Sequence, residues 1–298
     1  MRVYEVGPRD GLQNEKTPVP TDAKLRFIQL LADAGLRDIE ATSLVSPRAV
    51  PQLADADELL ARLERRPGVR YPVLVPNARG LARAVTAGVD AICVFTAATE
   101  SFTRANIGMT IAESIDAFRP IVGEARDRGW WTRGYVSTAF GCPYEGEVAE
   151  SAVVAVARQL VELGVDEVSI GDTIGVAGPA DVRRAVGALL AEGIGADRLA
   201  MHFHDTRGTA LANVVAALEL GIRSFDASTG GTGGCPYAPG AAGNLATEDL
   251  AYLLDREGVT HGLDLDALLV AAAHVSQALG RALGTKVGQA GGWRVPVP

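Results

Sequence analysis

The chain has 298 residues, of which 48% are hydrophobic and 21% charged, so it can bury a full globular core, and disorder is not expected. It carries 28 Lys and Arg against 36 Asp and Glu, a net charge of −8, which argues against a general nucleic-acid-binding surface. Three scattered cysteines are too few for a disulfide framework, and no apolar run approaches the roughly 18 residues of a membrane span, so we expect a cytoplasmic protein without membrane contact.

Eight β-rich segments alternate with helical patterns along the chain. At four places, around Gly35, Gly88, Gly164 and Gly221, a helical stretch ends at a glycine and an apolar residue leads into the next strand. In chain order, the predicted strands lie at 3–6, 38–43, 71–76, 91–96, 132–138, 167–172, 199–204 and 224–228. Strict alternation of strand and helix predicts a parallel α/β sheet, and a (β/α)8 TIM barrel is the simplest architecture at this length.

The alternative is an open, doubly wound sheet. No GxGxxG follows the first strand and no GxxxxGK[ST] occurs, so the nucleotide-binding folds lack their usual support. After the eighth strand, helices are predicted near 247–255 and 265–283, before a Gly- and Pro-containing tail. No linker is apparent. We therefore expect a single domain over 1–298, with the barrel over about 1–257 and a C-terminal helical extension over about 258–298.

The stretch MHFHD at 201–205 carries two of the four histidines. In an extended strand, His202 and His204 face the same way about 6 to 7 Å apart, which suits two ligands of one metal ion. Two polar residues on a solvated strand face are the alternative. Because strands one, seven and eight of a barrel are neighbours, Asp10 and an oxygen donor from the loop after strand eight can join the histidines. Such a set fits Mg²⁺ or Mn²⁺ better than a closed zinc site.

Other polar residues follow the carboxyl ends of the predicted strands, where barrel enzymes carry their chemistry. They include Arg9, Glu40, Ser43, Tyr135 and Asp172. A plain salt bridge between Arg9 and Asp10 is the alternative to a catalytic arginine. The glycine-rich loop 230–243 carries Cys235, and it could be a passive connection, a phosphate cradle or a lid whose thiol exchanges a proton with a reacting carbon.

Several motifs together resemble 3-hydroxy-3-methylglutaryl-CoA (HMG-CoA) lyase, within a wider group of metal-dependent barrels that includes isopropylmalate and homocitrate synthases. They are EVGPRDGLQNEK, SLVSPRAVPQ, RGYVS, GCPYEG, GDTIGV, HFHDTRG and GGCPYAPGAAGNLATEDL, and they span nearly the whole chain. RDG and HxHD are shared by the wider group, whereas GGCPYAPGAAGN is far more specific to the lyase. The resemblance implies cleavage of HMG-CoA to acetyl-CoA and acetoacetate, the retro-Claisen step of leucine breakdown.

The resemblance also implies roles for individual residues. A divalent cation, Mg²⁺ or Mn²⁺, would be bound by Asp10, His202, His204 and Asn244. Arg9 would be the catalytic arginine and Cys235 the catalytic thiol, with Glu40, Asp172 and Glu248 in support and His202 or Asp172 as the candidate base. Lys16 would meet the CoA arm, and Ser43 and Tyr135 are further candidates for contact with the acyl-CoA.

Two features depart from the family pattern. The C-terminal KVGQAGGWRVPVP lacks the terminal cysteine that some animal members use as a redox switch, and Thr232 stands where members often have a larger apolar residue. Two other functions remain as alternatives: a transferase that condenses acetyl-CoA with a 2-oxo acid, and a non-catalytic, metal-stabilised binding barrel. We also expect a homo-oligomer.

Overall fold

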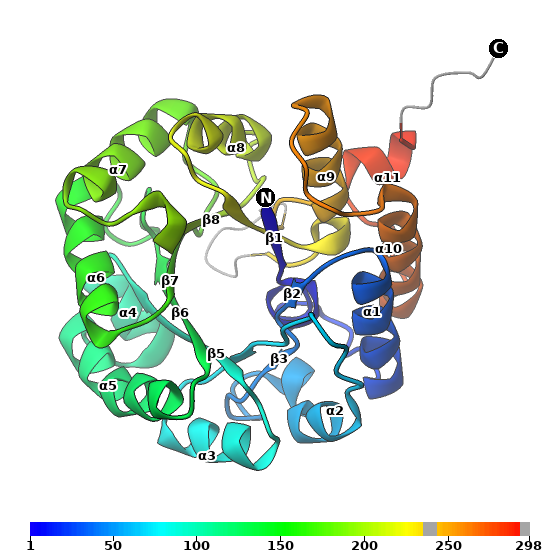
Figure 1. Cartoon of the computed structure of the whole chain (residues 1–298), viewed down its shortest axis with the longest axis horizontal. Helices are drawn as coiled ribbons and strands as arrows, with labels where there is room; N and C mark the ends of the chain where they lie inside the picture. The colour runs from blue at the N-terminus through cyan, green and yellow to red at the C-terminus, as the bar shows by residue number, and fades with distance from the viewer. Residues whose placement is uncertain (235–242, 293–298) are drawn as a thin grey trace.

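A computed structural model describes residues 1–234 and 243–292. Its strands form one parallel sheet that curls into a ring, with the helices around it (Figure 1). The strands are β1 (Arg2–Glu5), β2 (Asp38–Ile39), β3 (Thr42–Ser43), β4 (Val73–Leu74), β5 (Ala91–Ala97), β6 (Trp131–Ser137), β7 (Glu167–Asp172), β8 (Leu199–Phe203) and β9 (Ser224–Ala227). Their order is β2-β1-β9-β8-β7-β6-β5-β4-β3.

The first and last strands of this order belong to one extended segment, residues 38–43. Within it, the Glu40 N–H donates to the Glu5 carbonyl on one side and the Ala41 N–H donates to the Pro72 carbonyl on the other, both at 2.9 Å. The segment therefore joins β1 to β4 and closes the ring. The predicted (β/α)8 barrel is confirmed, and the open doubly wound sheet is wrong.

Two predicted strands are shorter than expected. The segment 38–43 is split into β2 and β3, because the backbone of residues 40 and 41 bonds to different neighbours and makes no regular ladder with either. The strand expected over 71–76 is reduced to Val73–Leu74. Pro72 and Pro76, which flank it, have no N–H to donate to a ladder.

The helices form the outer ring of the barrel (Figure 1). They are α1 (Thr21–Asp33), α2 (Ala56–Arg62), α3 (Ala78–Thr86), α4 (Glu100–Ile107), α5 (Ile111–Asp127), α6 (Glu150–Leu163), α7 (Pro179–Ala191), α8 (Ala210–Glu219), α9 (Thr247–Arg256), α10 (Leu265–Leu279) and α11 (Lys286–Ala290). Single turns lie at η1 (Gly7–Gly11), η2 (Pro51–Leu53), η3 (Ala196–Arg198) and η4 (Thr229–Gly231). Within the described ranges, none of these helices has the length and apolar character to cross a bilayer.

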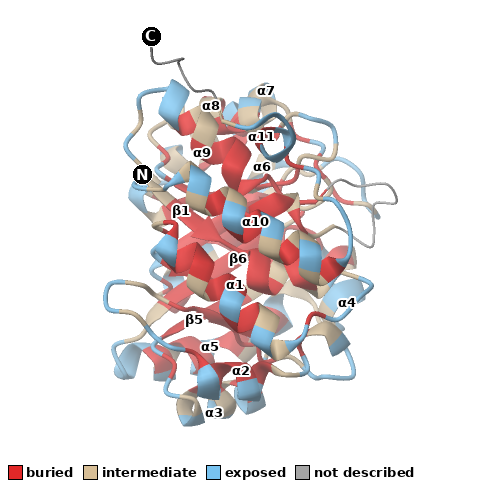
Figure 2. Cartoon of the chain, turned by 90° about the vertical axis from the view of Figure 1, so that its right-hand side faces the viewer, coloured by how far each residue is buried: buried red, intermediate tan, exposed pale blue. Residues whose placement is uncertain are grey.

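The C-terminal helices pack against the barrel. α10 lies against α1, where the Asp264 N–H donates to the Ala34 carbonyl (2.9 Å), and its buried Leu268 and Val275 belong to the main apolar core. Figure 2 looks onto this side and shows buried and exposed residues alternating along both helices. The helix predicted over 265–283 ends earlier, at Leu279, because Gly280 takes a left-handed conformation (φ 66°) that closes it.

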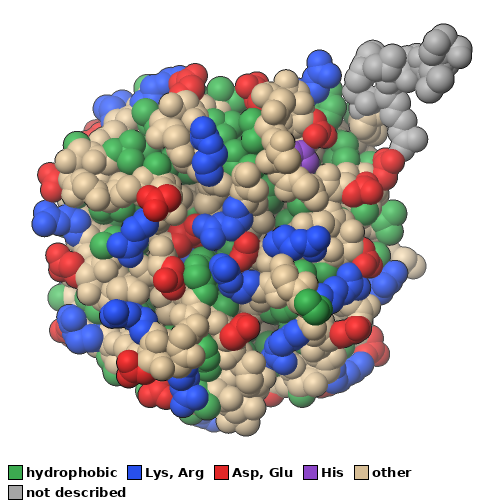
Figure 3. Space-filling model, viewed as in Figure 1, with side chains coloured by type: hydrophobic (Ala, Val, Ile, Leu, Met, Phe, Trp, Pro, Cys, Tyr) green, Lys and Arg blue, Asp and Glu red, His purple; other side chains and the backbone are tan. Residues whose placement is uncertain are grey.

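One face of the molecule is seen in Figure 3. Basic and acidic side chains are interspersed over it, and neither sign dominates. This face therefore carries no broad basic patch.

Candidate metal centre and active site

Arg9 and Asp10 lie on η1, a single π-helical turn that follows β1 directly. The N–H groups of both residues donate to the Val6 carbonyl, at 3.1 and 2.8 Å. Gly7 allows the turn to form, since a Cβ there would lie 2.5 Å from a carboxylate oxygen of Glu5. π turns are rare in proteins, and those that occur are often found at functional sites. This one brings two successive charged side chains to the cavity at the carboxyl ends of the strands.

Asp10, His202 and His204 form a group that could hold one metal ion. One ligand atom from each lies within 4.8 Å of the others, and the two Nε2 atoms of the histidines are 3.2 Å apart. Adjacent ligands that each lie about 2.1 Å from one ion are separated by about 3.0 Å in octahedral and about 3.4 Å in tetrahedral geometry. The observed separation therefore fits two ligands of a shared ion.

Asn244 completes the group. Its backbone pairs with that of His204, and its Nδ2 donates to Asp10 Oδ2 at 2.8 Å. Its Oδ1 is buried without a hydrogen-bond partner among the described residues. A buried, unsatisfied amide oxygen beside a carboxylate and two imidazoles is a donor that a divalent cation would satisfy. The four residues thus fit the cation that the sequence predicts.

The charge states of His204 and Asp10 favour metal binding. Burial and the neighbouring His202 lower the pKa of His204 to about 4, so its imidazole is neutral at physiological pH. Burial tends to raise the pKa of Asp10, but the Arg9 guanidinium, the two histidines and the Asn244 amide together hold that pKa below its usual value. A neutral imidazole and an ionised carboxylate are the forms that coordinate a metal.

Arg9 is fixed by two carboxylates and is only 7% exposed. Its Nη1 donates to Asp10 (2.9 Å), its Nη2 donates to Glu40 Oε2 (3.0 Å), and its Nε lies 2.9 Å from Glu40 Oε1. The Tyr135 hydroxyl donates to the same Glu40 oxygen (2.8 Å), and its ring lies under the guanidinium, 5.5 Å from centroid to Cζ. Burial tends to lower the pKa of Arg9, but Glu40 and Asp10 raise it well above its usual value, so the charge is permanent.

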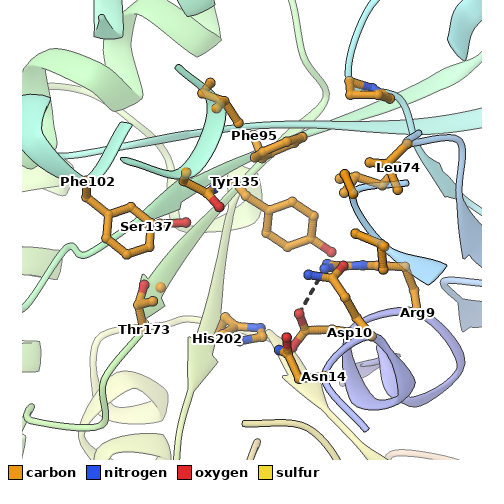
Figure 4. Close-up of a pocket in the computed structure, with 18 of the residues that line it drawn as sticks. Arg9, Asp10, Asn14, Leu74, Phe95, Phe102, Tyr135, Ser137, Thr173 and His202 are labelled. Carbon is orange, nitrogen blue, oxygen red and sulfur yellow. Dashed lines mark hydrogen bonds and ion pairs between the residues drawn. The ribbon is translucent and has the colours of Figure 1, made fainter. Parts of the chain in front are cut away.

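These groups face a cavity of about 760 Å³ (Figure 4). Arg9, Asp10 and His202 lie on one side of it, and the apolar Leu74 and Phe95 lie across from them. Asn14, Ser137, Thr173 and Phe102 also line the cavity. The cavity therefore combines a charged, cation-binding side with an apolar wall, as a site for an acyl group requires.

The structure brings most of the predicted site residues together, namely Arg9, Asp10, Glu40, Tyr135, His202, His204 and Asn244. Asp172 is turned to the loop after β7, where its two oxygens accept the N–H groups of Val176 (2.9 Å) and Ala177 (3.0 Å). Glu248 accepts the Gly230 N–H and holds η4. Cys235 lies outside the described residues.

Two of the residues expected to contact the acyl-CoA, Lys16 and Ser43, are not among those that line the cavity. Lys16 is exposed, two positions beyond Asn14, which lines the cavity. Ser43 is buried at the end of β3, where its hydroxyl accepts the Val45 N–H (3.3 Å), and Val45 itself lines the cavity.

Asp226 was missed by the sequence interpretation. It lies on β9, within the predicted strand 224–228, and its Oδ2 is 3.0 Å from His202 Nδ1. The available signal was an acidic residue between Phe225 and Ala227 inside a predicted strand, a position where a buried charge needs a specific partner. Asn14 and Phe95, which line the cavity, were also not predicted. Asn14 stands in the motif EVGPRDGLQNEK without a role attached to it, and Phe95 belongs to none of the motifs.

The class of the protein follows from this arrangement. A closed (β/α)8 barrel carries a fixed arginine and a group that could hold a cation at the carboxyl ends of its strands, as (β/α)8-barrel enzymes do. Comparison with known proteins gives the family. A family model described as HMGL-like matches residues 1–275, and the chain belongs to this family.

Its relatives are similar over nearly their full length. The mitochondrial hydroxymethylglutaryl-CoA lyase of Bos taurus is 49% identical over 290 residues, which cover 97% of this chain and 89% of the relative. The crystal structure of the hydroxymethylglutaryl-CoA lyase from Pseudomonas aeruginosa is 46% identical, with a TM-score of 0.94, and the match covers 97% of this chain and 96% of that one. An HMG-CoA lyase from Acinetobacter baumannii, solved with coenzyme A and 3-methylmalate, is 40% identical, with a TM-score of 0.94, and covers 100% and 98%.

Proposed function

We propose that this protein is a carbon–carbon lyase that cleaves HMG-CoA to acetyl-CoA and acetoacetate. The observation that carries the proposal is the grouping of Arg9 with Asp10, His202 and His204 at one cavity, in a chain whose relatives are named hydroxymethylglutaryl-CoA lyases. The condensing transferase and the non-catalytic barrel have no comparable support.

The reaction breaks the bond between C2 and C3 of the acyl group. The C3 hydroxyl loses its proton and becomes the ketone of acetoacetate, while C2 keeps the bonding electrons as the enolate of acetyl-CoA and then takes up a proton. When bound by Asp10, His202, His204 and Asn244, a divalent cation, Mg²⁺ or Mn²⁺, supplies the Lewis acidity that lowers the pKa of the substrate hydroxyl.

The chain's own residues stabilise the other end of the breaking bond. Arg9 faces the cavity with a permanent charge, and we assign it to the thioester oxygen, on which negative charge grows as the enolate forms. Glu40 and Tyr135 hold the guanidinium in place. Asp172 shapes the loop that presents Thr173 to the cavity.

Cys235 is assigned the proton donated to C2, on the strength of its place in the glycine-rich signature. We expect Cys235→Ser to slow the release of acetoacetate while Mn²⁺ affinity stays the same. Cys142→Ser, which alters the buried thiol of the similar motif GCPYEG, is the matched control and should keep the normal rate. An unaffected rate in Cys235→Ser would exclude the thiol from the reaction.

For the CoA arm, we assign Lys16 to a phosphate group, while the buried Ser43 supports the cavity wall through its hydrogen bond to Val45. An exposed ammonium that follows η1 can reach a phosphate outside the cavity without entering it. Tyr135, which lines the cavity, contacts the acyl end.

The proposal is tested by incubating the purified protein with HMG-CoA and Mg²⁺ or Mn²⁺, with and without a chelator, and measuring acetoacetate. We expect release of acetoacetate that depends on the cation. A parallel incubation with acetyl-CoA and 2-oxo acids, in which free CoA is measured, tests the condensing transferase. Condensation without cleavage, or no reaction in either assay, would contradict the proposal.

We also propose that the chain forms one catalytic domain and works in the cytoplasm as a homo-oligomer. The core shared by α10 and the barrel supports the first point, and the free thiols Cys93 and Cys142 agree with a reducing compartment. Sedimentation velocity measures the oligomeric state, and a single unfolding transition is expected of one domain.

A further inference from the structure

Asp226 lies directly behind one of the candidate cation ligands. Its Oδ2 is 3.0 Å from Nδ1 of His202, and the other ring nitrogen, Nε2, points to His204. An ionised carboxylate can only accept, so Nδ1 must carry the proton. His202 then offers the lone pair of Nε2 to the site.

The contact is built into the barrel itself. His202 and Asp226 are register partners on the adjacent strands β8 and β9, so the sheet sets their distance and no loop is involved. Groups placed on strands are held more closely than groups on loops. The backbone positions of both residues are therefore fixed by the ladder between β8 and β9.

The carboxylate is held in turn by two donors. Ser169 Oγ donates to Oδ2 (3.0 Å), and the fully buried guanidinium of Arg133 donates to Oδ1 (2.5 Å). The pair with this guanidinium, in which neither side chain is exposed, keeps the carboxylate ionised. Arg133 is itself fixed by Glu167, with Nε 2.9 Å from Oε1, and it stacks on Tyr4.

The second histidine has no such support. His204 Nδ1 is buried and has no hydrogen-bond partner in the part of the chain that the structure describes. The two histidines thus differ. A carboxylate sets the position of the ring proton of His202, whereas His204 has no such carboxylate partner among the described residues.

We propose that Asp226 is a positioning residue for the cation site, which holds His202 with its proton on Nδ1 and its Nε2 free to bind the ion. The inference deepens the proposed function, because it rests on the same cation site. Partners of this kind, hydrogen-bonded to a ligating histidine, change metal affinity about 10- to 100-fold when they are removed.

Asp226→Asn tests the proposal, because the neighbouring hydrogen-bond donors determine how the new amide is oriented. Arg133 can only donate, so the new side chain must turn its carbonyl oxygen to Arg133 and its NH2 group to His202. The amide then donates to Nδ1, and the proton of His202 moves to Nε2, where it blocks the ion. We expect Mn²⁺ affinity, measured by titration calorimetry and by the electron paramagnetic resonance signal of free Mn²⁺, to fall 10- to 100-fold.

Ser169→Ala is the matched control. It removes the other donor to the same carboxylate oxygen and leaves the hydrogen bond to His202 in place. Its Mn²⁺ affinity should stay within about twofold of the unmodified protein, and melting temperatures show whether each variant is folded. A folded Asp226→Asn protein with normal Mn²⁺ affinity would overturn the proposal.

A second measurement needs no variant at Asp226. The chain has only four histidines, so nitrogen-15 spectra of histidine-labelled protein can resolve the tautomer of each. The sample is saturated with Mg²⁺ at pH 8. The variants His261→Gln and His274→Gln assign the signals of the two histidines outside the site. We expect His202 to carry its proton on Nδ1, and a proton on Nε2 would overturn the proposal. Neither measurement uses HMG-CoA. Failure of the proposed cleavage is seen in the acetoacetate assay and is therefore distinguishable from failure of this inference.

Discussion

Arg9 has little freedom to move, because two carboxylates and an aromatic ring surround its guanidinium. It meets Glu40 through one hydrogen bond, from Nη2, and through an ion-pair contact between Nε and Oε1, and these two points hold the guanidinium in place. Removing one partner of such a buried pair leaves the other charge uncompensated, at a cost of about 3 to 5 kcal/mol in stability. Any test of the arginine must therefore separate catalysis from folding.

We expect Arg9→Gln to lower kcat for HMG-CoA cleavage about 10²- to 10³-fold, because one donor to a growing oxyanion is worth roughly 3 to 4 kcal/mol. Mn²⁺ affinity should not weaken, since Gln removes a positive charge next to Asp10. Steady-state kinetics and titration calorimetry measure the two effects.

Two controls accompany this variant. The double variant Arg9→Gln/Glu40→Gln removes the unpaired charge, so it should regain stability but not turnover. Arg48→Gln alters an exposed arginine and should keep full activity. Near-normal turnover in a folded Arg9→Gln protein would contradict the role assigned to Arg9.

The sequence predicted well those site residues that lie close to one another along the chain. His202 and His204 are two positions apart, and the alternation of a strand alone places them on one side. Asp226 meets His202 only through the register of two strands, which depends on the packing of the whole barrel. No pattern near residue 226 carries that information.

At the scale of elements, Glu5 ties three segments together at the base of the site. Its carboxylate accepts the N–H groups of Gly7 and Thr229 (both 2.8 Å) and the hydroxyl of Thr247 (2.7 Å), which belong to η1, η4 and α9. The helices and most strands were predictable from periodicity. The π turn and the split of β2 from β3 were not, because both depend on bonds to residues distant in the chain.

A pH dependence of stability follows from Glu248, in the first turn of α9. Burial raises its pKa to about 8, although the Gly230 N–H opposes the shift. In the unfolded chain a glutamate titrates near 4.3, so the protonated carboxyl of the folded state stabilises the protein at low pH. That contribution is lost as the pH rises towards 8.

We expect the free energy of unfolding to fall by about 2 to 3 kcal/mol more between pH 6 and pH 9 in the unmodified protein than in Glu248→Gln. Guanidinium titrations at the two pH values measure the difference. Glu257→Gln, which alters an exposed glutamate just beyond α9, should behave like the unmodified protein. Equal pH dependence in the unmodified protein and Glu248→Gln would show that Glu248 is not the source.

At the scale of the whole molecule, the site joins opposite ends of the chain. Asp10 and Asn244 are 234 positions apart and share a hydrogen bond, and His204 pairs with Asn244. The count of eight strands predicted this closure, since the first and last strands of a barrel must be neighbours. The number of strands did not predict the position of α10. This helix packs on α1, and no pattern in its own sequence indicates that contact.

Because its ligands come together only when the ring is closed, the cation should bind the folded protein and not the unfolded chain. At a concentration 100 times its Kd, such a ligand stabilises the fold by about 2.7 kcal/mol. Divided by an unfolding entropy of about 2.1 cal/mol/K per residue, this free energy corresponds to a rise of about 4 °C in Tm. Calorimetry of the protein with Mn²⁺ and with a chelator measures the rise. His204→Ala should abolish the rise, whereas His274→Ala, which alters a contact between α10 and α1, should keep it. A rise that survives the loss of His204 would place the stabilising ion elsewhere and leave the proposed lyase without its metal centre.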